Sequence, residues 1–500
     1  MTPPRLPTVI RTTHRFTPDP RRVVAKPHLP GEEHYAPCTK SRVRVILERI
    51  LAIPDDEASG IVAEVLSGFS HRHREFTRVL GHHFDLVSHH LDPHVAISEE
   101  RRMLIGAYFT LEYAIEGAAL FNPSMVPSPD QSGLPSAPGL EQRFIMSVRT
   151  VGEGHISSIG FRTGIIDERC NLTFDQVSNY ATLGTRETPL YDKALFVAKI
   201  GELEASNEIS TAVLEPLPAR FTFAELNASL KTIDAIPAFA PVISFETTRI
   251  IHMLASSNYI ASYPRESSIS ERVIFPAGPL ENQGMEDARF VRFVHDDRSV
   301  VYYATYTAFD GVEVLPQLID TTDFLSFRIG TLNGVEARNK GMALFPRLID
   351  GKYCMLSRSD RENLYLMRSD NVRLWNETTL LQTPQQAWEF IQIGNCGSPI
   401  ETDAGWLVLT HGVGPMRRYA LGAMLLDLEN PQRIIGQLRQ PLMVPEPDER
   451  EGYVPNVLYS CGSMVHRDHL VIPYGFSDSG IRIALVRISE LIEAMEGDQR

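Results

Sequence analysis

The sequence predicts an all-β fold, a five-bladed β-propeller, preceded by an N-terminal α-helical extension. Three observations lead to this fold class. Apolar residues recur at helical spacing between residues 41 and 117, and a proline-rich segment follows at residues 122–139. Beyond that segment, short β-rich runs separated by turn residues continue to the C-terminus, with few helical patterns between them.

The helical extension is predicted from apolar residues spaced three and four positions apart. This spacing occurs over residues 43–50, 61–69 and 76–87. Ser98 precedes two glutamates, and a serine N-cap followed by acidic residues stabilises the first turn of a helix. We therefore expect a fourth helix that begins after Ser98 and runs as far as Ile115.

Residues 122–139 are predicted to separate two domains. The segment contains five prolines, and because proline has no backbone N–H, neither a helix nor a central strand is expected there. We expect an N-terminal extension at residues 1–139 and a propeller domain at residues 140–500. Residues 173–264 are long for one connection and hold a predicted helix at residues 223–230, so we expect an insertion there.

A weak internal repeat favours a propeller over a sandwich or a barrel. Four segments share the order of polar residues, a strand, a turn and a second strand, and they begin at Asp287, Leu344, Gly397 and Cys461. Spacings of roughly 50–60 residues suit four-stranded blades. The paired runs within residues 144–161 add a first blade and bring the expected number to five.

Composition limits the classes of function. Lys and Arg total 48 against 62 Asp and Glu, a formal net charge of −14, which argues against a protein that binds duplex nucleic acid through phosphate contacts. No apolar run approaches the roughly 20 residues that cross a bilayer. Residues 1–24 lack the apolar segment of a secretory signal.

The five cysteines are widely spaced and never form Cys-x-x-Cys. We interpret them as reduced thiols that form neither a disulfide framework nor a zinc site. The sequence therefore predicts a cytoplasmic protein without nucleic-acid or membrane partners. Its oligomeric state stays open, a homo-oligomer included.

The segment Gly284-Met-Glu-Asp-Ala-Arg-Phe is expected to place charged side chains at the corner of one blade. Inner strands of a propeller end at a central funnel, so such corners meet although they are far apart in sequence. Glu286 and Asp287 are adjacent carboxylates beside Arg289. Because side chains alternate along a strand, we expect Glu286 and Asp287 to point to opposite faces, one of them into the funnel.

Other corners contribute mostly basic and polar residues. The third repeat brings Arg338, Lys340 and Arg358, the fourth His411 and Tyr419, and the fifth Asp478. The first blade holds Arg149 and the turn Gly152-Glu-Gly-His155, from which His155 would reach the funnel. Basic side chains that converge beside one carboxylate in an acidic protein predict an anion pocket next to an acid.

These corners resemble a known family. Gly284-Met-Glu-Asp-Ala-Arg-Phe is similar to the Gly-x-Glu-Asp-Pro-Arg element of glycoside hydrolase family 130, the inverting β-mannoside phosphorylases and related β-mannosidases. The resemblance continues in the family's order through Tyr306-Thr-Ala-Phe-Asp-Gly, Asn339-Lys-Gly-Met-Ala-Leu-Phe-Pro, Gly397-Ser-Pro-Ile and Tyr474-Gly-Phe-Ser-Asp. Members of this family are five-bladed propellers, in agreement with the repeat.

The resemblance implies roles for individual residues. Asp287 would be the general acid, acting through a hydroxyl of the bound mannose. Phosphate contacts would come from Arg289, Lys340, Arg358, His411 and Tyr419. Substrate contacts are expected from Asn258, Glu286, Asp310, Asp478, Arg149 and His155. The implied partners are a β-mannoside oligosaccharide and inorganic phosphate as co-substrate, with no metal and no organic cofactor.

Two reactions are compatible with this family. An inverting hydrolase needs a second carboxylate to activate water, whereas a phosphorylase uses phosphate, which is already an anion and calls for cations. The basic residues favour phosphorolysis of a terminal β-mannosyl linkage to α-mannose 1-phosphate. The alternatives are a β-mannosidase, with Glu266, Glu336 or Glu401 as the base, and a non-catalytic propeller that binds glycans or proteins.

Overall fold

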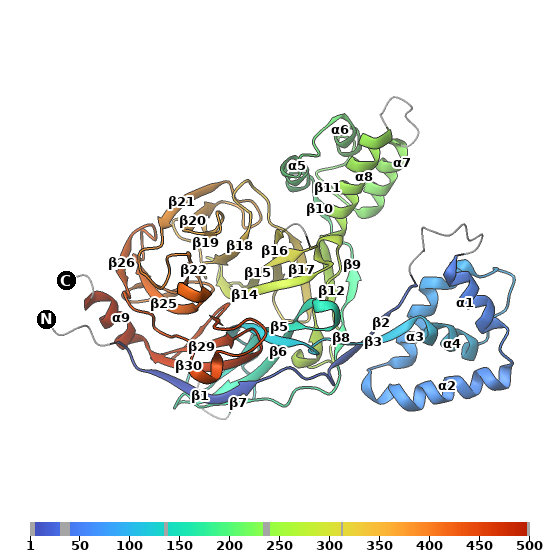
Figure 1. Cartoon of the computed structure of the whole chain (residues 1–500). Coiled ribbons are helices and arrows are strands. Elements are labelled where there is room, and N and C mark those ends of the chain that lie inside the picture. Colours follow the sequence, from blue (N-terminus) through green and yellow to red (C-terminus); the bar gives the residue numbers. More distant parts are fainter. Residues whose placement is uncertain (1–5, 31–40, 135–138, 234–240, 312–313, 498–500) are drawn as a thin grey trace. The chain divides into compact units, whose positions relative to one another are not determined.

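The fold is mainly β, as predicted (Figure 1). This computed structural model describes residues 6–30, 41–134, 139–233, 241–311 and 314–497. Contacts divide the chain into two compact units. The larger unit comprises Met1–Pro18, Ala118–Val177 and Gly184–Arg500, and the smaller unit comprises Asp19–Gly117 and Ser178–Leu183.

The smaller unit contains the four predicted helices and one strand pair. These elements are α1 (Arg42–Leu51), α2 (Asp55–Phe69), α3 (Phe76–Val87), α4 (Glu99–Tyr108), β2 (Val23–Pro27) and β3 (Thr110–Ala114). Ser98 Oγ accepts a hydrogen bond from Arg101 N at 3.1 Å and caps α4 as expected. The helix ends at Tyr108 rather than Ile115, because the residues that follow pair with β2 as strand β3.

The larger unit holds four sheets of four or more strands among the described residues. The first runs β4 (Ala119–Pro127), β5 (Gln142–Val151), β6 (Ser157–Ile166), β14 (Gly284–Val294), β15 (Val300–Phe309), β16 (Val314–Thr321), β17 (Ser326–Thr331), β12 (Tyr259–Ser262) and β9 (Thr185–Glu187), with β7 (Leu172–Phe174) beside β6. Among the described residues, strand pairing between its two halves is limited to Gly284, which pairs with Ser157 in parallel.

The other three sheets are antiparallel. One consists of β18 (Lys340–Leu344), β19 (Tyr353–Arg358), β20 (Leu364–Ser369) and β21 (Glu377–Gln382). The next contains β22 (Gln392–Asn395), β23 (Ile400–Thr402), β24 (Gly405–Val413), β25 (Tyr419–Leu426) and β26 (Ile434–Gln437). The last contains β27 (Leu458–Tyr459), β28 (Met464–His466), β29 (His469–Phe476), β30 (Gly480–Arg487) and β1 (Val9–Phe16), and α9 (Ile488–Gly497) follows β30.

The segment predicted as an insertion forms a helical group with its own core. It contains β10 (Tyr191–Asp192), α5 (Lys193–Glu202), α6 (Glu208–Leu214), β11 (Arg220–Phe221), α7 (Phe223–Ile233) and α8 (Pro241–Ser256), gathered together in Figure 1. The α7 helix confirms the helix expected at residues 223–230. Phe196, Phe221 and Leu254 are among the buried residues that hold the group together.

The start of the proline-rich segment forms an edge strand, which is compatible with the expectation that it holds no central strand. Residues Ala119–Pro127 form β4, which pairs with β5 and is the end strand of its sheet, with an isolated bridge from Ser124 to Gly462 on its other side. A shift of register between Phe121 and Ser124 places Pro123 in a bulge. Proline is tolerated there, since an edge strand or a bulge needs no N–H donor for the ladder.

Pairing at the N-terminus also differs from the predicted division at residue 139. Val9 of β1 pairs with Val486 of β30, so the first strand of the chain belongs to the last sheet. With β4 also in the larger unit, the contacts divide the chain at residues 18 and 118. None of the described helices is long and apolar enough to span a membrane.

Candidate active site

The predicted carboxylate corner lies on a bulge of β14. The register between β14 and β15 shifts between Glu286 and Arg289, and Asp287 has a φ of 57°. A bulge bends the strand and redirects its side chains. The expected alternation is therefore wrong: Arg149 Nη2 donates to Glu286 Oε1 at 2.8 Å and Arg149 Nη1 to Asp287 Oδ1 at 3.4 Å.

Asp287 is held by an amide that the sequence interpretation missed. Asn122 Nδ2 donates to Asp287 Oδ1, and Asn122 itself sits in the bulge of β4 with a φ of 49°. Burial acts to raise the pKa of Asp287, but Arg149, Lys340 and Arg289 lower it more, and the net pKa lies below its usual value. Asp287 is therefore ionised at neutral pH in the unliganded protein.

Glu286 is paired with two cations. Besides its contact with Arg149, it accepts a hydrogen bond from Lys340 Nζ. Lys340 begins β18, flanked by Asn339 and Gly341, which have φ values of 61° and 85°. These left-handed residues turn the chain so that a lysine of one sheet faces a glutamate of another.

Arg289 forms a buried layer behind the carboxylates. Its side chain is 2% exposed, and Nη1 donates to Asn395 Oδ1, while Nη2 donates to Tyr459 Oη at 2.6 Å. Asn395 Nδ2 donates in turn to Gly341 O at 2.6 Å. Asn395 and Tyr459, which the sequence interpretation missed, thus link four sheets behind Asp287.

Arg358 and His411 lie beside this layer. Arg358 Nη1 is 3.1 Å from His411 Nε2, and His411 Nδ1 is 3.2 Å from Asn395 O. Burial, then the charges of Arg358 and Arg289, hold the pKa of His411 well below its usual value. A neutral imidazole that donates from Nδ1 and accepts at Nε2 fits both contacts.

Arg358 has a donor to spare. Its Nε–H is buried and has no hydrogen-bond partner within the described residues. Tyr419 stacks on the His411 ring, with 6.0 Å between ring centroids and 11° between planes. Lys340, Arg358 and Tyr419 are only partly buried, so this side of the cluster is in contact with solvent.

Asp478 is the third carboxylate near these charges. It follows β29 with a φ of 49°. Burial raises the pKa of Asp478 to about 6, and nearby Asp287 and Glu286 add to this rise against the opposing effect of Arg149. The sequence prediction that this residue shares a site with Asp287 agrees with this electrostatic coupling.

Comparison of the chain with known proteins identifies the same family as the motifs. The model of that family, described as β-1,4-mannooligosaccharide phosphorylase, matches residues 246–497. The chain belongs to glycoside hydrolase family 130. A 1,2-β-oligomannan phosphorylase from Thermoanaerobacter sp. (strain X514) is 33% identical over 219 residues, which cover 42% of this chain and 71% of the relative.

A second relative and one solved structure are also similar to this chain. A β-1,2-mannobiose phosphorylase from the same strain is 33% identical over 221 residues, covering 42% of this chain and 68% of the relative. The solved structure of a β-1,2-mannobiose phosphorylase from Listeria innocua, in complex with β-1,2-mannobiose, has 21% identity and a TM-score of 0.45, covering 77% of this chain and 93% of that one. The resemblance inferred from the motifs is thus confirmed.

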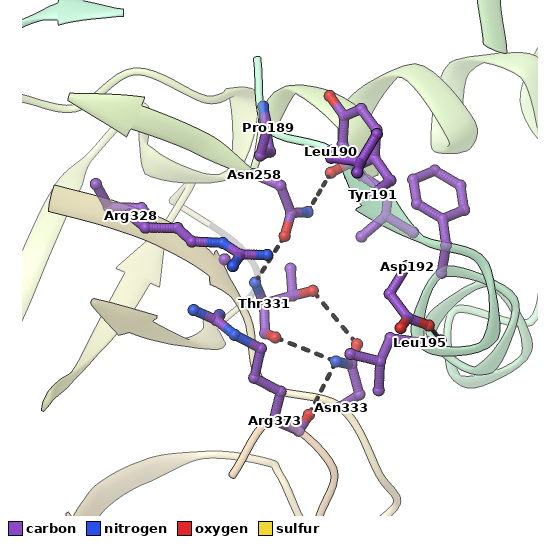
Figure 2. A pocket seen from close by; sticks show the side chains of 14 residues that line it. Pro189, Leu190, Tyr191, Asp192, Leu195, Asn258, Arg328, Thr331, Asn333 and Arg373 are labelled. Carbon is purple, nitrogen blue, oxygen red and sulfur yellow. Dashed lines mark hydrogen bonds between the residues drawn. The ribbon is translucent and has the colours of Figure 1, made fainter. Parts of the chain in front are cut away.

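Not every predicted substrate residue of this family member joins the cluster. Asn258 lies in a separate pocket of about 50 Å³, shown in Figure 2. Its Nδ2 donates to Leu254 O at 2.8 Å, and its Oδ1 accepts from Thr331 N at 3.2 Å. Its amide is therefore engaged in joining α8 to β17.

Asp310 and His155 lie at the margins of the charged cluster around Asp287. Asp310 directly follows Phe309, whose ring centre is 6.0 Å from Lys340 Nζ. His155 is exposed and stacks on Tyr453, with Nδ1 3.3 Å from the Tyr453 hydroxyl. These positions suit contacts with an extended substrate better than contacts with the reacting bond.

The glutamates considered as hydrolytic bases are engaged elsewhere or exposed. Glu401 forms an ion pair with Arg347 at 2.6 Å, and Glu336 lies 3.9 Å from Arg338. Glu266 is exposed. Arg338, predicted as part of the anion pocket, is thus directed to Glu336 instead of Asp287.

Proposed function

We propose that the protein is an inverting β-mannoside phosphorylase that transfers a terminal β-mannosyl unit to inorganic phosphate and releases α-mannose 1-phosphate. The prediction of a mannoside phosphorylase is confirmed by the family match and by the names of the relatives. Inversion and the roles of single residues are the proposed part.

The single observation that carries the proposal is the set of cations around Asp287. The guanidinium groups of Arg149 and Arg289 and the Lys340 ammonium all act on its pKa. Phosphate is a dianion near neutral pH, and fixed cations at strand ends stabilise it and the charge that develops as it attacks. A hydrolase would need a free carboxylate at this place.

The burial of each basic side chain determines the role that we propose for it. Lys340 and Arg358 are partly exposed, so we assign them, with the Tyr419 hydroxyl, to direct phosphate contacts. Arg289 and His411 are buried and already bonded to Asn395. Their proposed role is to hold the phosphate-binding side chains in place.

The depressed pKa of Asp287 has a consequence for the mechanism. A general acid must carry a proton, and the cations keep Asp287 ionised. Bound phosphate neutralises Lys340 and its neighbours, and it adds negative charge near Asp287. Both effects raise the pKa of Asp287, so phosphate binding prepares the acid for the reaction.

The bond changes then follow in one step. A phosphate oxygen forms a bond to the anomeric carbon on the face opposite the leaving oxygen, and the glycosidic bond breaks. The proton of Asp287 passes through a mannose hydroxyl to the leaving oxygen, which leaves Asp287 as a carboxylate. Glu286 and Asp478 are proposed to accept hydrogen bonds from the sugar hydroxyls.

The finer features of the fold are proposed on the same basis. The groups β4–β7, β14–β17, β18–β21, β22–β26 and β27–β30 with β1 supply five blades, and the helices of the smaller unit supply the N-terminal helical extension. We also propose a cytoplasmic protein, since Cys170, Cys354, Cys396 and Cys461 are free thiols.

The test is a comparison of phosphorolysis with hydrolysis. The protein is incubated with β-1,2- and β-1,4-mannobiose, with and without phosphate, and mannose 1-phosphate and free mannose are quantified. The proposal predicts mannose 1-phosphate only when phosphate is present and little mannose without it. Release of mannose at the same rate in both conditions would identify a hydrolase, and no turnover of either disaccharide would contradict the proposed substrate.

A further inference from the structure

Two turns of the larger unit bring together three side chains of types that can bind a metal. All three are far in the sequence from Glu286 and Asp287. Cys170 lies in the turn between β6 and β7, and Asp468 and His469 lie at the start of β29. Cys170 Sγ is 3.5 Å from His469 Nδ1, which is 2.7 Å from Asp468 Oδ1. All three ligand atoms lie within 4.8 Å of one another.

Neighbouring hydrogen bonds hold the two turns against each other. His466 Nε2 is 2.9 Å from Asp167 O, and Arg467 Nη1 donates to Glu168 O at 2.9 Å. Cys170 is 7% exposed and has a φ of 64°, a backbone conformation that is unfavourable for a residue with a side chain. The thiol is thus fixed beside the imidazole by the surrounding structure.

The spacing of the sulfur and nitrogen atoms fits a tetrahedral zinc ion. With a Zn–S bond of about 2.3 Å and a Zn–N bond of about 2.0 Å, tetrahedral geometry holds sulfur and nitrogen about 3.5 Å apart. This equals the distance between Cys170 Sγ and His469 Nδ1. A set of one thiolate, one imidazole and one carboxylate binds zinc in preference to calcium or magnesium.

Asp468 completes the set with a small movement. Its hydrogen-bond distance to His469 must lengthen to about 3.3 Å when both atoms bind one ion. The Asp468 side chain is 60% exposed, and its Oδ2 accepts from Arg487 Nη1 at 3.2 Å. The second oxygen is thereby anchored, as outer contacts commonly anchor a metal ligand.

We propose that Cys170 Sγ, His469 Nδ1 and Asp468 Oδ1 bind one zinc ion, with water as the fourth ligand. On binding, the Cys170 thiol loses its proton to solvent, and the imidazole proton moves from Nδ1 to Nε2. The ion joins a turn of the sheet that contains β6 to a turn of the sheet that contains β29 and so cross-links the two sheets.

The charges around the thiol are mixed. Burial, Asp468 and Asp167 raise the pKa of Cys170, whereas Arg467 and Arg487 lower it. Burial and the two carboxylates disfavour a free thiolate, and a bound dication reverses their effect. Arg467 and Arg487 oppose the cation. Arg487 is paired with the Asp468 carboxylate, whereas Arg467 donates to the backbone carbonyl of Glu168.

The experiment measures metal binding without reference to catalysis. The full chain is dialysed against a chelator and titrated with zinc in competition with a chromophoric chelator, and with Co²⁺, whose thiolate complexes show a charge-transfer band. Wild type should bind one ion per chain. Cys170→Ala should abolish the cobalt band, and His469→Ala and Asp468→Asn should each weaken binding by at least about tenfold.

Cys354→Ala is the matched control, since Cys354 is a buried free thiol of another sheet. It should keep both the stoichiometry and the cobalt band. Asp468→Asn alters an exposed side chain and keeps the test decisive if Cys170→Ala does not fold. No binding by wild type would overturn the proposal, as would equal binding by wild type and by the folded ligand variants.

Discussion

Replacement of Lys340 by alanine is the most informative perturbation of the proposed phosphate site. Lys340 Nζ donates to Glu286 and its side chain is 39% exposed, so the change removes a charge without leaving a buried cavity. A hydrogen bond to a charged group contributes about 1.5–3 kcal/mol. Because about 1.4 kcal/mol is a factor of ten, the KM for phosphate should rise by roughly 10- to 150-fold.

The assay measures initial rates over a series of phosphate concentrations at a fixed, saturating concentration of β-mannobiose. Lys352→Ala is the control: Lys352 is 38% exposed and lies 3.7 Å from Asp370, so it matches Lys340 in exposure and in having a carboxylate neighbour. Its KM should not change. A KM for phosphate within twofold of wild type in Lys340→Ala, or an equal rise in the control, would refute the assignment.

Three further predictions concern single residues. Asp287→Asn should lower kcat by at least about 100-fold while the protein stays folded, and retention of a tenth of the wild-type rate would exclude Asp287 as the acid. Asn122→Ala removes a hydrogen bond that lowers the pKa of Asp287, so the falling alkaline limb of kcat against pH, which reports the substrate complex, should move to higher pH, and an unmoved limb would contradict this. Burial, with a smaller effect of His82, lowers the pKa of His83 from 6.5 to about 4, so its contribution to stability is complete above pH 6.5 and is lost as the pH falls toward 4. Denaturant unfolding at several pH values should show that the free energy of unfolding depends less on pH in His83→Gln than in wild type. His82→Gln, which changes an exposed neighbour, should leave this pH dependence almost unchanged.

Local patterns in the sequence predicted several of the regular elements. The run Gly405–Thr410 is apolar and bounded by turn residues, and it forms most of β24. The cap at Ser98 depends on contacts within one helical turn, and it was predicted correctly. The end of α4 was not, because Tyr113 and its neighbours pair with β2, a strand more than 80 residues earlier in the chain.

The carboxylate corner was predictable in composition but not in geometry. The repeat indicated that Asp287, Lys340 and Arg149 would meet, and the structure brings them together. The bulge at Asp287 depends on how β14 registers with β15, which no local pattern specifies. Asn122 was missed because its strand lies in a proline-rich segment; an Asn-Pro pair directly after four apolar residues is the signal that would have indicated it.

The proposed zinc site shows the same limitation for cysteines. The sequence interpretation excluded zinc because no Cys-x-x-Cys is present. Cys170 and His469 are 299 residues apart and meet only because two turns of different sheets dock. Spacing rules detect ligands that share one loop, so ligands assembled from distant turns escape them.

The central claim is that phosphate attacks the anomeric carbon in a site of cations around Asp287. The most direct measurement is NMR of the reaction with a β-mannobiose and phosphate, observed from the first turnover onward, so that the initial anomeric configuration is recorded. The account predicts α-mannose 1-phosphate as the first product, in an amount equal to the mannose released from the reducing end. β-Mannose 1-phosphate as the first product, or free mannose released in place of the phosphate ester, would contradict it.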